Sequence, residues 1–86
     1  MTRFTVICRP NAETELAQLW LDANDRGRIA NAADSIEHEL RKDADAKGDA
    51  TREGFRRLIV PPLSALFTVS EEDRKAIIWS FNLLAD

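Results

Sequence analysis

The chain has 86 residues, a formal net charge of −3 and an apolar share of 44%. This length predicts a single domain over residues 1–86, and the apolar share argues against intrinsic disorder. One cysteine excludes an internal disulfide, and no apolar run approaches the roughly 18 residues of a membrane-spanning helix. No charged-then-apolar leader opens the chain, so we expect a soluble cytoplasmic protein with no membrane partner.

The first residues predict a strand followed by a helix. Phe4, Val6 and Cys8 alternate with more polar residues, which gives a strand one mainly apolar face. Apolar residues then recur at helical spacing over about residues 11–22. Pro10 suits the first position of this helix, and Asn11 could instead be its N-cap.

A second helix and three strands are predicted after this. Asp25 is suited to cap a helix whose apolar stripe runs from Ile29 to Leu40. Residues 43–54 are polar and predict a mobile loop. The apolar period then changes to two, which predicts strands over 55–60, 63–70 and 74–84, joined as an antiparallel meander. The expected fold class is therefore α+β, in the order β-α-α-β-β-β, with a helical hairpin packed on one face of a small, mainly antiparallel sheet.

Several residues that often carry chemistry are expected to be structural here. One Cys and one His, far apart, form no metal-binding pattern, and no glycine-rich phosphate loop is present, so we expect neither a metal nor a cofactor. Cys8 is expected in the core and His38 in solvent. Trp20 on its helix stripe, and Trp79 on a strand face shared with Ile77, Phe81 and Leu83, are both expected in the core.

The arginines of the second part are the strongest candidates for a site. Residues 1–50 carry seven Lys or Arg against ten Asp or Glu, which disfavours nucleic-acid binding, whereas residues 51–86 carry five of each. Strand alternation places Arg56 and Arg57 on opposite sides of the sheet. Arg74 could approach them across the meander. Such cations can stabilise a phosphoryl transition state, and they are also common on a solvated sheet face.

The element order and the run GFRRLIVPPLSALFTVSEEDRKAIIWSF resemble the RelE/ParE superfamily of bacterial toxins from type II toxin–antitoxin pairs. The opening FTVICRPNAETELAQLW resembles the first strand and helix of that family, and IANAADSIEHEL resembles its second helix. The resemblance covers nearly the whole chain. It implies a toxin that a cognate antitoxin neutralises.

The resemblance implies two different activities. RelE-like toxins cut messenger RNA on the ribosome, where cations hold the phosphate, and ParE-like toxins poison DNA gyrase. By position, Arg56, Arg57 and Arg74 match the catalytic cations, and Lys75 and Arg52 are candidates for substrate binding. The chain departs from the nuclease pattern because it has no tyrosine and no histidine in its sheet half.

Three alternatives therefore stay open: a ribosome-dependent endoribonuclease, a protein-binding toxin that acts on gyrase or another macromolecule, and a degenerate member that binds only its antitoxin. The antitoxin is expected to be acidic or neutral. The sequence leaves open whether the chain forms a homo-oligomer.

Overall fold

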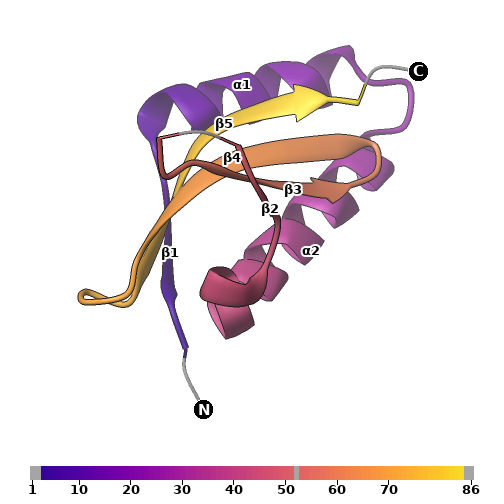
Figure 1. Ribbon diagram of the computed structural model, residues 1–86. Helices are drawn as coiled ribbons and strands as arrows, with labels where there is room; N and C mark the ends of the chain where they lie inside the picture. Colours follow the sequence, from indigo (N-terminus) through magenta and orange to yellow (C-terminus); the bar gives the residue numbers. More distant parts are fainter. Residues whose placement is uncertain (1–2, 52, 85–86) are drawn as a thin grey trace.

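Two helices cover one face of a five-stranded sheet in the computed structural model, which describes residues 3–51 and 53–84 (Figure 1). The sheet order is β1-β5-β4-β3-β2. The predicted α+β fold, with its helical hairpin on a mainly antiparallel sheet, is confirmed. The elements are β1 (Thr5–Cys8), α1 (Pro10–Asp22), α2 (Arg26–Asp43), a short 3-10 turn (Ala44–Ala46), β2 (Asp49–Ala50), β3 (Arg56–Val60), β4 (Leu63–Ser70) and β5 (Lys75–Leu83).

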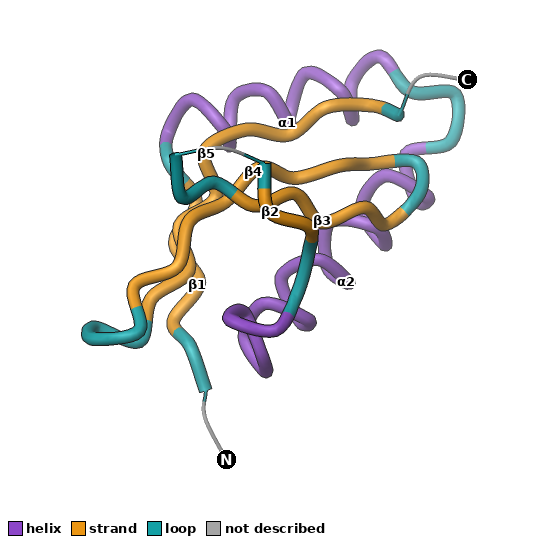
Figure 2. The backbone as a smooth tube through the Cα atoms, viewed as in Figure 1, coloured by secondary structure: helices purple, strands orange, loops and turns teal. Residues whose placement is uncertain are grey.

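The sheet combines an antiparallel meander with one parallel edge strand. Strands β3, β4 and β5 pair in chain order, as predicted, and β1 pairs with β5 in parallel. Figure 2 shows β4 and β5 bending together, so that the tip of their hairpin lies away from the β3–β4 turn. In the described ranges, no helix is both long and apolar enough to cross a membrane.

The segment predicted as a loop contains a fifth strand. Residues Asp49 and Ala50 form β2, which pairs with Arg57 and Arg56 at the start of β3. The chain turns into this pairing at Gly48, which has φ +75°, a conformation that side chains other than glycine rarely adopt. The polar composition of residues 43–54 did not indicate a strand, because β2 is short and lies at the edge of the sheet.

The core lies between the helices and one face of the sheet. The stripe on α2 meets the inward residues of β4 and β5, and Phe4, just before β1, lies next to it. Alternation along β1 places Val6 and Cys8 against this core, as predicted. The buried apolar residues are Phe4, Ala12, Ile29, Ala32, Ile36, Leu40, Ala44, Leu63, Ala65, Phe67, Ala76, Ile78 and Phe81.

A β-bulge in β5 overturns the predicted position of Trp79. Leu66 pairs with Ser80 but the next residue, Phe67, pairs with Ile78, so Trp79 is an additional residue in β5. The bulge shifts the alternation by one, and Ile78 and Phe81 therefore both face the core. The prediction that Trp79 shares a core face with Phe81 is wrong for this reason.

Trp20 is also outside the core, because it lies at the exposed end of its helix stripe with 40% of its surface accessible. The Arg26 guanidinium carbon lies 4.7 Å from the centre of the Trp20 ring. The same guanidinium donates to the carbonyl oxygens of Trp20 and Leu21 at 3.2 and 3.1 Å. Arg26 therefore caps the C-terminal end of α1, where a positive charge is favourable.

Two side chains of α1, from Asn11 and Glu15, form hydrogen bonds with the backbone of β5 beyond the part that pairs with β1. Asn11 Nδ2 donates to the carbonyl oxygen of Trp79 at 2.9 Å, so Asn11 is not the N-cap, and the helix begins at Pro10 after Arg9. The backbone N–H of Phe81 donates to Glu15 Oε1 at 3.3 Å. The second helix begins as predicted, with Asp25 accepting from the N–H of Arg28 at 3.1 Å.

Candidate functional site

The candidate site is the face of the sheet that the helices do not cover, here called the open face. Strand register defines it, because paired residues point to the same side of a sheet. The face mixes hydroxyl, amide, aliphatic and guanidinium groups. Its members on β3, β4 and β5 are Arg57, Ile59, Ser64, Leu66, Thr68, Ser70, Lys75, Ile77, Ser80 and Asn82, and Trp79 joins them at the bulge.

Trp79 anchors an aromatic cluster on the open face, formed with Phe55, Arg9 and Thr68. Trp79 Nε1 donates to Thr68 Oγ1 at 2.8 Å. The Phe55 ring meets the Trp79 ring edge-on at a centroid distance of 5.9 Å. The Arg9 guanidinium carbon lies 4.7 Å from the Trp79 ring centre, a cation–π contact. The cluster therefore holds the Trp79 ring and the positive charge of Arg9 together beside β5.

Two predicted site residues lie on the open face by register, Arg57 near the aromatic cluster and Lys75 at the far end of β5. Arg57 is exposed, and it pairs with Leu66 of β4. Together with Thr51, Glu53 and Phe55 it lines a shallow hollow of about 350 Å³. Phe55 belongs to both this hollow and the aromatic cluster and so lies between Arg57 and the Trp79 ring, and it also lines the hollow that contains Arg56.

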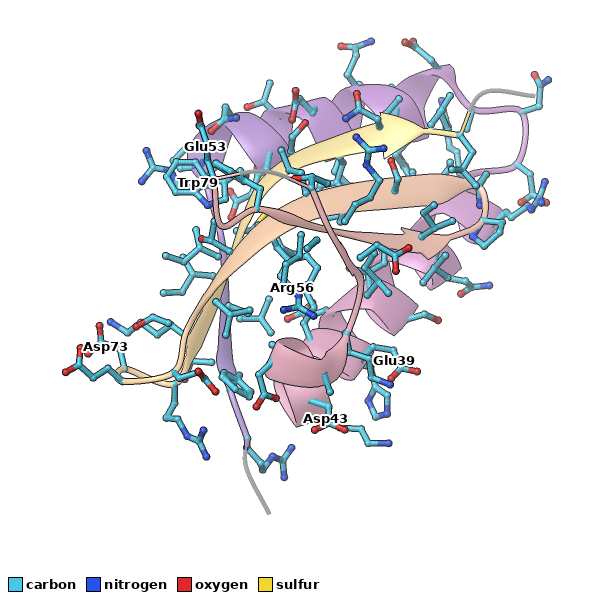
Figure 3. The ribbon with its side chains drawn as sticks, viewed as in Figure 1. Glu39, Asp43, Glu53, Arg56, Asp73 and Trp79 are labelled. Atoms are coloured by element: carbon cyan, nitrogen blue, oxygen red, sulfur yellow. The ribbon has the colours of Figure 1, made fainter. Side chains whose placement is uncertain are left out.

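Arg56 points to the other side of the sheet, as alternation predicts. Its Nε donates to the carbonyl oxygen of Lys47 at 2.9 Å, which ties β3 to the turn after α2. Figure 3 shows Arg56 on the side of the sheet where α2 ends. The hollow of about 390 Å³ that Arg56 lines also contains Asp45, Glu53 and Glu71. Three carboxylates make this an unfavourable place for a phosphate.

The two cations of the last hairpin lie far from Arg57. Lys75 pairs with Ser70, four residues along β4 from the partner of Arg57, so about 13 Å separates them in the strand direction alone. The Arg74 guanidinium carbon lies 5.1 Å from the ring centre of the core residue Phe4. In Figure 3, Asp73 marks the tip of this hairpin, well away from Arg56.

The structure therefore does not bring the predicted arginines together. Arg57 lies on the open face, Arg56 on the helix side and Arg74 at the hairpin end, and Arg52 falls outside the described residues. Whether any of them binds substrate stays a prediction. Sequence reasoning did not place Trp79, Phe55 or Arg9 in the site. Trp79 was assigned to the core because the bulge leaves no signal in the apolar pattern.

The same arrangement of elements occurs in solved structures of toxin–antitoxin systems. One chain of the RelBE2 toxin–antitoxin complex from Mycobacterium tuberculosis has a TM-score of 0.80 and 18% identity, over 100% of this chain and 97% of that one. A chain of the chromosomal ParDE toxin–antitoxin system from P. aeruginosa has a TM-score of 0.68 and 15% identity, over 96% and 98%.

A conserved hypothetical protein from Helicobacter pylori has a TM-score of 0.57 and 11% identity, over 93% of each chain. No protein-family model matches the chain, and no curated protein matches it significantly. The structural likeness establishes a RelE/ParE-like fold.

Proposed function

We propose that this chain is the toxin of a type II toxin–antitoxin module in the bacterial cytoplasm, held inactive by a cognate antitoxin. Its fold supports this, since similar chains come from the RelBE2 toxin–antitoxin complex and a ParDE toxin–antitoxin system. The toxin acts by binding a macromolecular target, with DNA gyrase as the first candidate, through the open face. One observation carries this mechanism: Arg57 and the aromatic cluster both lie on the open face with Phe55 in common, while Arg56 bonds Lys47 on the helix side and Arg74 packs on Phe4.

The geometry favours binding over cleavage. A phosphoryl transition state needs several positive groups directed at one phosphate, because negative charge grows on its oxygens. Arg57 is the predicted cation on this part of the open face, and the guanidinium of Arg9 is held by the Trp79 ring. A mixed surface of rings, aliphatic side chains and one exposed guanidinium is typical of protein recognition.

Ribosome-dependent cleavage of messenger RNA is the second candidate, and one observation favours it. Glu53 and Arg57 line the same hollow, together with Thr51. A carboxylate beside a guanidinium could accept the proton of a 2′-hydroxyl while Arg57 holds the neighbouring phosphate. This candidate makes Glu53 indispensable, whereas target binding alone does not.

Growth arrest on expression of the chain without its antitoxin tests the proposal. Arg57→Ala should abolish arrest, and Arg56→Ala, the matched change on the helix side, should preserve it at equal soluble yield. Arg74→Ala and Lys75→Ala should also preserve it. An Arg57→Ala chain that arrests growth fully would contradict a role for the open face.

Two assays then separate the targets. Loss of gyrase supercoiling activity in the presence of the purified chain supports the first candidate. Mapped 5′ ends of messenger RNA that cluster at codon positions, and vanish in Glu53→Gln, support the second. A folded chain that causes no arrest at any expression level refutes the toxin assignment.

A further inference from the structure

A continuous apolar groove runs between the two helices, on the opposite side of the sheet from the open face. One part, of about 400 Å³, lies between α1 and α2 and includes Leu16, Trp20 and Ile29. A second part, of about 340 Å³, reaches down to Val6 and Cys8. The two parts form one groove because both include Glu13, Leu16, Ala33 and Asp34.

The walls and floor of this groove are mainly apolar: Leu16, Ala33, Val6 and Cys8 are half-buried, and the floor beneath them reaches the buried core. Cys8, Ile78 and Phe81 are floor residues from β1 and β5, and Ala33 belongs to the wall from α2. Trp20 closes one end with 40% of its surface exposed. A concave apolar surface of this kind is the usual receptor for the apolar stripe of a partner segment.

The rim of the groove is acidic. Of the described residues that line it, the charged ones are Glu13, Asp34 and Glu37. Glu37 already pairs with Arg41 at 2.6 Å. Among the described residues, neither Glu13 nor Asp34 forms an ion pair. Glu13 from α1 and Asp34 from α2 therefore line both parts of the groove as carboxylates that no cation of the described residues pairs with.

Carboxylates near the groove also affect the Cys8 thiol on its floor. Burial, and then the charges of Glu13, Glu37 and Glu15, raise the pKa of Cys8 from 9.0 to about 11. A nearby negative charge disfavours the thiolate and favours any cation that enters the groove. The electrostatics of the floor thus agree with those of the rim.

We propose that the groove binds an amphipathic helix of the antitoxin that places lysine or arginine side chains against Glu13 and Asp34. This rests on the proposed function. A helix fits better than a strand, because the floor is made of side chains and the adjacent edge of β5 is already bonded to Asn11 and Glu15. The antitoxin is thus expected to be locally basic at this contact, whatever its net charge.

Thiol labelling of Cys8 at about pH 9 measures occupancy of the groove directly. The probe is a synthetic helical peptide of about 15 residues, with leucines at i, i+3, i+4 and i+7 and lysines beside them. A matched peptide carries glutamate in place of lysine. At saturation the lysine peptide should slow labelling about tenfold or more, and the glutamate peptide should leave the rate unchanged, because only one complements the rim.

Matched variants test the role of the rim. Glu13→Gln with Asp34→Asn should weaken the lysine peptide about tenfold, as expected for two ion pairs at a partly exposed site. Glu71→Gln with Glu72→Gln, the same charge change in the β4–β5 turn, should leave the affinity unchanged. Equal protection by both peptides, or by neither, overturns the proposal. Labelling that slows as the chain itself is concentrated assigns the groove to a second copy and also overturns it.

The same assay separates this inference from the proposed function. If a co-expressed candidate antitoxin abolishes growth arrest but leaves Cys8 freely labelled, the groove proposal fails and the toxin assignment stands. If the chain causes no arrest but the lysine peptide protects Cys8 through Glu13 and Asp34, the toxin assignment fails and the groove is a binding site for another basic helix.

Discussion

Alanine at Gly48 should destabilise the chain strongly, for two separable reasons. The first is conformational, because φ is +75° and a left-handed backbone costs a residue with a side chain about 1–2 kcal/mol. The second is steric. A Cβ at Gly48 would lie 2.6 Å from the carbonyl oxygen of Arg57 and 3.1 Å from the Phe67 ring. Overpacking of this kind costs about 1–3 kcal/mol.

The expected loss in the free energy of unfolding is therefore about 2–5 kcal/mol. For a domain of this size, about 1 kcal/mol corresponds to about 4–8 °C in Tm. Thermal denaturation followed by circular dichroism should show Tm falling by at least about 8 °C. Neither neighbour can easily yield, since one is backbone of β3 and the other is a fully buried ring.

The other glycines provide matched controls. Gly54 has φ +82° with nothing within 4 Å of its Cβ position, so Gly54→Ala should show only the conformational cost, about 1–2 kcal/mol. Gly27 lies in α2, where Asp25 Oδ1 at 3.5 Å makes an ordinary contact, and Gly27→Ala should gain about 0.4–1 kcal/mol. Equal losses for Gly48→Ala and Gly54→Ala would refute the close approach of Gly48 to β3.

Three further predictions concern single side chains, those of Glu15, Cys8 and Trp79. Glu15→Ala leaves the amide of Phe81 without its acceptor, so unfolding should become easier by about 1 kcal/mol and hydrogen exchange at that amide should accelerate. The pKa of Cys8 is raised, chiefly by burial, from 9.0 to about 11, so its contribution to stability is complete below pH 9 and is lost as the pH rises through about 11. Denaturant titrations across that range, compared with Cys8→Ala, should show the difference. Trp79→Phe removes the donor to Thr68, and urea denaturation should show a loss of about 0.5–1.5 kcal/mol.

Each of these has an outcome that contradicts it. Glu13→Ala removes a neighbouring carboxylate without touching β5, so exchange at Phe81 should be slow in that variant. A stability profile for Cys8→Ala parallel to that of the parent between pH 9 and 11 would mean that the thiol titrates normally. A Trp79→Phe chain as stable as the parent would show that the indole N–H bonds equally well to water.

Regular alternation made much of the fold predictable from the sequence. Apolar residues from Ile29 to Leu40 recur at helical spacing, and those from Phe4 to Cys8 alternate as in a strand. Each of these spacings is sufficient to identify the element and its buried face. Strand β4 was predicted with the bounds that the structure has, because turn residues flank a mainly apolar segment on both sides.

The failures cluster where a single residue changes the phase or where pairing is brief. The bulge at Trp79 changes which residues of β5 before it face the core, and no residue type in the sequence indicates that a bulge is present. Strand β2 consists of two residues held by a turn at Gly48, which is too short for any periodicity. The candidate site depends on both features, since β2 brings Thr51 toward the open face and the bulge delivers Trp79 to it.

The parallel pairing of β1 with β5 constrains when this protein can finish folding during synthesis. Residues 5–8 pair with residues 75–78, about 70 positions later, so the first strand made is among the last to be docked. The β3–β4–β5 meander can close from local contacts, but the floor between the helices stays incomplete until β5 has left the ribosome. A nascent chain therefore cannot complete this floor before residues 75–83 have been synthesised, and a ligand of the groove can bind only after that point.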